Sequence, residues 1–218
     1  KPYKQRKVRI LNGAHTSMVL GAYLAGQDIV RDCMKDDVIR GYMNQAIYKE
    51  IIPTLTLPEE ELMSFAASVT DRFQNPFIDH ALLSISLNST AKWKARVLPS
   101  LEGYLEKTGQ VPPCLSASLA FYLAFYKGIG FVDATFTGDR NVKNQYPISD
   151  DPKVLEFYDA HKDDSAADYV HAVLSETSFW GKDLTTLAGL EETVVKDFTF
   201  IQEKGCYELM KQIVNAAE

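Results

Sequence analysis

Apolar residues recur at helical spacing along most of the chain. In the segment 36–55, Val38, Tyr42 and Ala46 follow one another at intervals of four, and Pro53 closes the pattern. The same kind of spacing predicts further helices at 16–34, 58–73, about 114–127, 151–161, 165–180 and 190–214. No series of alternating strand-like segments lies between them. The pattern therefore predicts a mainly α fold, with residues 1–218 forming a single multi-helical domain.

Two of these segments are apolar around most of the helix and are expected to be buried. Residues 16–34 include Gly21 and Gly26, which would let another element approach the backbone closely. The run "LSASLAFYLAFY" at 115–126 is the longest apolar stretch, and it is too short for a membrane span of roughly 20 residues. It is interpreted as a buried helix. A Gly-rich loop is expected near 128–150, because no helical pattern continues there.

Composition narrows the class of protein. The 218 residues are 46% hydrophobic and 11% aromatic, which favours a packed globular core over disorder. The formal net charge of −6 argues against a general nucleic-acid binder. The three cysteines, Cys33, Cys114 and Cys206, are widely spaced and form no CxxC pair, so neither a zinc site nor a disulfide framework is expected. A cytoplasmic protein, with no membrane partner, is the plain expectation.

Several common catalytic and cofactor motifs are missing from the sequence. The nearest approach to a dinucleotide fingerprint is "KGIGFVDATFTG", in which Gly128 and Gly130 precede Asp133 and the third glycine is absent. We interpret it as a flexible loop. The sequence contains no Walker A motif, no GxSxG elbow and no HExxH, so a serine hydrolase or a metalloprotease has no support.

The stretch "RKVRILNGAHTSM" contains three polar side chains suited to proton transfer. On a regular helix Asn12 and His15 lie one turn apart, and Lys7 lies about 80° from His15 around the axis. Gly13 between them would leave room for a ligand. Lysine can exchange a proton with a substrate hydroxyl, and an amide N–H can bind the reacting oxygen. The alternative is a solvated Lys7, a helix-capping Asn12 and a hydrogen-bonded core His15.

This stretch resembles a known family. "KVRILNGAHT" reproduces the K-x4-N-x2-H pattern of the long-chain mannitol dehydrogenase family of polyol and sugar-acid dehydrogenases. The similarity continues through residues 46–101, including "RFQNP", and more weakly through "FWGKDLT" and "GLEETV". The resemblance implies a multi-helical C-terminal domain of the 6-phosphogluconate dehydrogenase C-terminal-like type. It also implies an N-terminal Rossmann domain upstream of this chain. The five basic residues and missing methionine at the start fit a fragment of a longer protein.

The resemblance also implies a reaction. It is an NAD-dependent, metal-independent oxidation of a sugar acid, with D-altronate and D-tagaturonate as the expected pair. Lys7 would be the general acid/base, Asn12 would help bind the reacting oxygen, and His15 would position substrate and lysine. Most NAD contacts, and a further oxyanion asparagine, would lie in the upstream half, so this chain alone should have little activity. The alternatives are mannonate/fructuronate or mannitol/fructose as substrates, and a non-catalytic helical binding or oligomerisation domain.

A second group of candidates would bind the substrate. "DRFQNPFIDH" places Arg72, Asn75 and His80 around a chain break at Pro76. Arg72 could bind carboxylate or hydroxyl oxygens. The alternative is that Arg72 pairs with an acid and Asn75 caps a turn.

The resemblance adds one basic contact to this group. Lys92 is the basic residue of "STAKWKARV" that it favours as a substrate contact, ahead of Lys94 and Arg96. Binding an anionic sugar acid to an acidic protein requires local cations, which Lys7, Arg9, Arg72 and Lys92 could supply.

Overall fold

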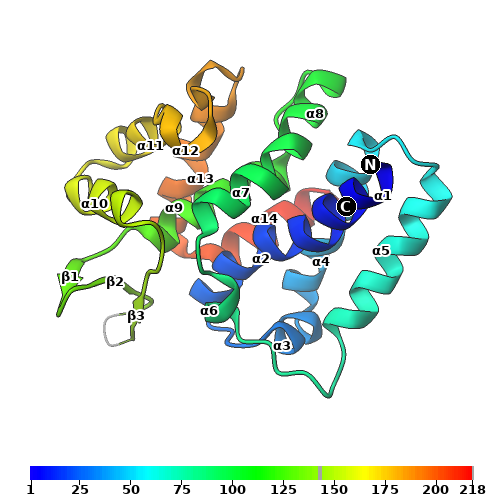
Figure 1. The fold of residues 1–218 in the computed structure, drawn as a ribbon, viewed down its shortest axis with the longest axis horizontal. Helices are drawn as coiled ribbons and strands as arrows, with labels where there is room; N and C mark the ends of the chain where they lie inside the picture. The colour runs from blue at the N-terminus through cyan, green and yellow to red at the C-terminus, as the bar shows by residue number, and fades with distance from the viewer. Residues whose placement is uncertain (142–143, 218) are drawn as a thin grey trace.

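The chain folds into a helical assembly with one small sheet at its edge (Figure 1). The computed structural model describes residues 1–141 and 144–217. Its α-helices are α1 (Pro2–Arg6), α2 (Gly13–Leu24), α3 (Val30–Lys35), α4 (Asp37–Gln45), α5 (Glu59–Phe73), α6 (Leu82–Ile85), α7 (Ser89–Arg96), α8 (Leu98–Thr108), α9 (Pro113–Tyr126), α10 (Pro152–Ala160), α11 (Ala166–Leu174), α12 (Thr177–Trp180), α13 (Leu190–Lys204) and α14 (Cys206–Ala216). Two π-helices, η1 (Lys7–Asn12) and η2 (Ala46–Ile51), and two 3₁₀ turns, η3 (Ile52–Thr54) and η4 (Leu184–Thr186), complete the helical part. The mainly α prediction is confirmed.

Helices α2 and α9 form the centre of the core, and α4, α13 and α14 pack around them. Nearly every residue of α9 is buried, as expected from its unbroken apolar sequence. Gly21 of α2 is a point of close approach, because a Cβ there would lie 2.6 Å from the Phe121 ring and 2.9 Å from Met210. A side chain at this position would separate α2 from both neighbours.

A buried carboxylate joins η2 to the start of α9. Glu50 is 1% exposed, and its two oxygens accept hydrogen bonds from the backbone N–H groups of Cys114 and Leu115, each at 2.9 Å. These are two of the N–H groups that a helix leaves without intrahelical partners. Burial raises the pKa of Glu50 to about 7, although the two backbone donors act in the opposite direction.

The segment expected to be a loop forms a three-stranded antiparallel sheet instead. Strands β1 (Gly130–Val132), β2 (Thr135–Asp139) and β3 (Gln145–Pro147) pair in the order β1-β2-β3. Phe136 and Tyr146 point into the core from β2 and β3. The strands are three to five residues long, so their alternation is too brief to stand out in the sequence. Figure 1 shows the sheet on the far side of the molecule from α5.

The segment 16–34 is divided between α2 and α3, where one helix was expected. The chain turns between them, and Ile29 forms an isolated bridge with Ala81. The three cysteines are buried and form no disulfide among the described residues. Among the described residues, no helix is long and apolar enough to cross a membrane.

Candidate functional site

Lys7, Asn12 and His15 lie on one continuous helical segment made of α1, η1 and α2. The segment from Lys7 to Asn12 is a π turn, so the expectation of a regular α-helix there was wrong. Since a π-helix bonds residue i to residue i+5, Lys7 lies one π turn before Asn12. His15 follows Asn12 after three residues of α-helix, which is again about one turn. The insertion thus removes most of the 80° offset and directs the three side chains to one side.

Arg9 holds this π turn against the rest of the fold. Its Nε donates to Ser100 Oγ and its Nη2 to Thr54 Oγ1, both at 2.6 Å. Burial lowers the pKa of the guanidinium. Arg9 therefore joins η1 to α8 and η3. Its Nε and Nη2 groups donate to protein side chains, whereas Arg9 was expected to be a cation available to an anionic substrate.

His15 lies between aromatic rings and has an uncommitted nitrogen. Its ring stacks on Phe73 at 4.1 Å between centroids and meets His80 edge-on at 5.8 Å. Its Nε2 is buried without a hydrogen-bond partner in the described part of the chain. Burial, followed by the charges of His80 and Arg96, lowers the pKa of His15 to about 4. A neutral imidazole with an open nitrogen can bind a ligand hydroxyl.

The structure separates the alternatives for this group. Asn12 has helical backbone angles and makes no capping bond, so it is not a helix cap. His15 is half-buried but not hydrogen-bonded through Nε2, so it is not the fully paired core histidine of the alternative. Lys7 is exposed, as the alternative expected. Lys7 therefore lies at the solvent-exposed end of this group of three residues, and His15 lies at its more buried end.

Gly13 has a different role from the one expected of it. It is buried, and a Cβ there would meet the backbone oxygen of Arg96 at 3.0 Å. The space beside Gly13 is therefore occupied by the C-terminal end of α7 and does not receive a ligand. Because Gly13 has no side chain, α7 packs directly against the Asn12–His15 segment.

The "DRFQNPFIDH" candidates lie at the end of α5 and in the loop that follows it. Arg72 is exposed and forms no ion pair with an acid in residues 1–141 and 144–217. Asn75 caps a turn, since its Oδ1 accepts from the Phe77 N–H at 2.9 Å, which is the structural alternative. His80 is exposed, and its ring contacts His15. His80 therefore lies beside the candidate residue His15, whereas Asn75 stabilises a turn in its own loop.

Lys92 lies on α7, one helical turn before Arg96. Its Nζ donates to the Ile85 carbonyl at 2.9 Å. Burial lowers the pKa of Lys92, as does the charge of Arg96, while Asp150 partly opposes them. Sequence reasoning ranked Arg96 below Lys92, but the charge of Arg96 acts on both Lys92 and His15. The available sequence signal was the i, i+4 spacing of the two cations.

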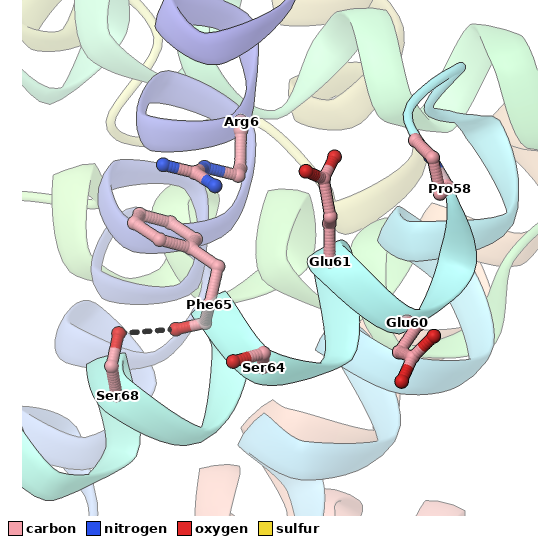
Figure 2. Close-up of a pocket in the computed structure, with 7 residues that line it drawn as sticks. All are labelled: Arg6, Pro58, Glu60, Glu61, Ser64, Phe65 and Ser68. Carbon is pink, nitrogen blue, oxygen red and sulfur yellow. Dashed lines mark hydrogen bonds between the residues drawn. The ribbon is translucent and has the colours of Figure 1, made fainter.

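Five surface cavities of the described residues are lined by other side chains than those of Lys7, Asn12 and His15. The first, of 530 Å³, lies between Arg6 and α5 (Figure 2). There the Arg6 guanidinium covers the Phe65 ring at 4.2 Å. Its lining residues are Arg6, Pro58, Glu60, Glu61, Ser64, Phe65 and Ser68.

In residues 1–141 and 144–217, no group of three or more His, Cys, Asp or Glu side chains gathers closely enough to hold a metal ion.

The fold is that of the helical part of polyol dehydrogenases. The Pseudomonas fluorescens mannitol 2-dehydrogenase, solved as a ternary complex with NAD and D-mannitol, superposes with a TM-score of 0.84 at 20% identity, over 98% of this chain and 41% of that one. A D-sorbitol dehydrogenase in substrate-free form gives 0.78 at 21% identity, over 95% and 40%.

Sequence similarity is more specific. The chain belongs to the mannitol dehydrogenase C-terminal domain family, which it matches over residues 1–202. It is 44% identical to an altronate oxidoreductase of Klebsiella pneumoniae, over 98% of this chain and 43% of that protein. It is 43% identical to one of Yersinia enterocolitica, over 94% and 41%. The chain therefore spans about two-fifths of the length of these relatives.

Proposed function

We propose that this chain is the substrate-binding and catalytic domain of an NAD-dependent oxidoreductase that interconverts D-altronate and D-tagaturonate. The similarity to altronate oxidoreductases at 43–44% identity supports the substrate. The mechanism is supported by the π turn at Lys7–Asn12, whose helical geometry would turn Lys7, Asn12 and His15 toward one side of a single helical segment. An acid/base group, an amide donor and an open imidazole nitrogen then face the same substrate.

Each side chain has a distinct task in this proposal. In the oxidation direction the Lys7 amine takes the proton of the substrate hydroxyl, whose O–H bond breaks as the C=O bond forms. Asn12 donates an amide N–H to that oxygen, without a change in its own charge. His15, neutral because its pKa is lowered to about 4, uses Nε2 to hold a neighbouring hydroxyl. In reduction the Lys7 ammonium returns the proton.

The described residues do not themselves form a dinucleotide site. The segment containing Gly128, Gly130 and Asp133 leads into the antiparallel sheet β1–β3, whereas a dinucleotide fingerprint needs a parallel βαβ unit. A bound nicotinamide would supply the hydride acceptor. Consistent with the length of the relatives, we place it on a part of the protein outside this chain.

The test is the substitution Lys7→Ala in the full-length protein that carries this chain. Removing a positioned acid/base group should lower kcat for altronate oxidation by about 10²–10⁴-fold while KM and NADH affinity change little. Lys4→Ala is the matched control, since Lys4 is an exposed lysine on the same helical segment. A Lys7→Ala protein with near-normal turnover would contradict the proposed mechanism.

A panel of substrates tests the remaining part of the proposal. Initial rates of the unsubstituted full-length protein with altronate, mannonate and mannitol separate the three substrate assignments. We expect altronate to give the highest kcat/KM. A higher kcat/KM for mannitol or mannonate would contradict altronate as the substrate and would assign that compound instead, with the same proposed roles for Lys7, Asn12 and His15.

A further inference from the structure

Arg96 is a half-buried cation without an acidic partner. Its pKa is lowered by burial, and it forms no ion pair in the described part of the chain. Within the described residues its side chain forms one hydrogen bond, from Nη1 to Thr16 Oγ1 at 3.5 Å, which is long for such a bond. A guanidinium has five donors in a planar fork that matches a carboxylate. The guanidinium is thus partly shielded from water, and most of its N–H donors form no hydrogen bond within the described residues.

A second cation adjoins it on the same helix face. Lys92 precedes Arg96 by four residues, and the charge of Arg96 lowers the pKa of Lys92. The carboxylate that faces Lys92 belongs to Asp150, and it already accepts from Thr90 Oγ1 at 2.9 Å and from the Tyr126 hydroxyl. Two positive charges therefore lie one turn apart on α7, and Asp150, which acts on Lys92, forms no ion pair with Arg96 among the described residues.

The packing of α7 brings this charge to the row of candidate residues. Because Gly13 has no side chain, the Arg96 backbone lies against the helical segment that carries Asn12 and His15. The charge of Arg96 acts on His15, whose open Nε2 belongs to the same region. A small ligand held by His15 and Asn12 would therefore lie beside a guanidinium that forms no ion pair among the described residues.

We propose that Arg96, assisted by Lys92, binds the carboxylate of the sugar acid and so selects an anionic substrate over a neutral one. This inference rests on the function proposed above and adds a specificity-determining residue to it. The chemistry is a bidentate, charge-assisted pair between a planar fork and a carboxylate. The partial burial of Arg96 strengthens that pair relative to one in open solvent.

The experiment compares Arg96→Gln with Lys94→Gln in the full-length protein. Lys94 is an exposed lysine on the same helix, so the control removes the same charge from the other side of α7. D-Altronamide supplies a neutral ligand of the same stereochemistry, measured as a substrate or as a competitive inhibitor. We expect Arg96→Gln to raise KM for altronate roughly 10–100-fold with kcat within about threefold, and to leave altronamide binding unchanged.

Further outcomes separate specificity from damage. Arg96→Lys keeps the charge but loses the fork, so its KM for altronate should fall between those of the unsubstituted and Gln proteins. An Arg96→Gln protein that behaves like Lys94→Gln, or that loses altronamide and altronate binding equally, would overturn the inference alone. Absence of altronate turnover in the unsubstituted protein would overturn the proposed function and this inference with it.

Discussion

The buried carboxylate of Glu50 should make the stability of this fold depend on pH. Glu50 is 1% exposed, and its pKa is raised from 4.5 to about 7. Between these values the folded state binds more protons than the unfolded state, so stability falls as the pH rises. The difference corresponds to about 3 kcal/mol, present below pH 4.5 and lost above pH 7.

The substitution Glu50→Gln isolates this contribution. Glutamine cannot ionise, so its folding carries no such dependence on pH. Its oxygen still accepts from one of the Cys114 and Leu115 N–H groups, while its NH₂ faces the other, at a cost of about 1–3 kcal/mol that does not vary with pH. Relative to the unsubstituted chain, Glu50→Gln should therefore gain about 3 kcal/mol between pH 4.5 and 8.

The assay is urea unfolding followed by far-ultraviolet circular dichroism at several pH values. The pKa of His15 is lowered to about 4, so its contribution makes the free energy of unfolding rise with pH between pH 4 and 6.5, opposite to Glu50. Both proteins contain His15, so this contribution cancels when their free energies of unfolding are compared. Glu60→Gln, an exposed substitution on α5, is the control, with an effect within about 0.5 kcal/mol at each pH. A Glu50→Gln difference that is constant across this range would show that the α9 donors outweigh burial and keep Glu50 ionised.

Two further predictions concern packing and His15. Gly21→Ala should destabilise the fold by about 1–3 kcal/mol, because its Cβ would lie 2.6 Å from the Phe121 ring, whereas Gly41→Ala, whose Cβ meets Val214 at 3.4 Å, should be neutral or stabilising; thermal unfolding of both variants checks this. Because His15 stays neutral above pH 5, His15→Asn in the full-length protein should lower turnover without moving any inflection of the pH–rate profile between pH 5.5 and 8. An inflection near pH 6.5 that disappears in His15→Asn would contradict this.

The long helices could be predicted from the sequence because their apolar spacing extends over several turns. Helix α9 was expected at about 114–127 and is found at Pro113–Tyr126, and α5 was expected at 58–73 and is found at Glu59–Phe73. Strands β1 to β3 could not be predicted in the same way. Their inward residues, such as Phe136 and Tyr146, are too few to establish a period of two.

The proposed site could be predicted less completely. Lys7, Asn12 and His15 are candidates because of a motif, but the role proposed for Arg96 has no such motif, because it depends on tertiary packing. Arg96 lies beside His15 since α7 packs against Gly13, which is far from it in sequence. The sequence suggested instead that the glycine admits a ligand, and only the structure shows that a helix fills the space.

The two π turns explain why regular helical geometry was an incomplete guide to both the site and the core. η1 and η2 contact each other, and each lies where a polar group must reach an unusual partner. In η1 Arg9 donates to Ser100 Oγ and Thr54 Oγ1, and in η2 Glu50 accepts from the first N–H groups of α9. An isolated helix disfavours such an insertion, so its presence at both positions requires packing to stabilise it. Because the two turns pack on each other, a change that regularises η2 should also displace η1, and with it the proposed alignment of Lys7 with His15.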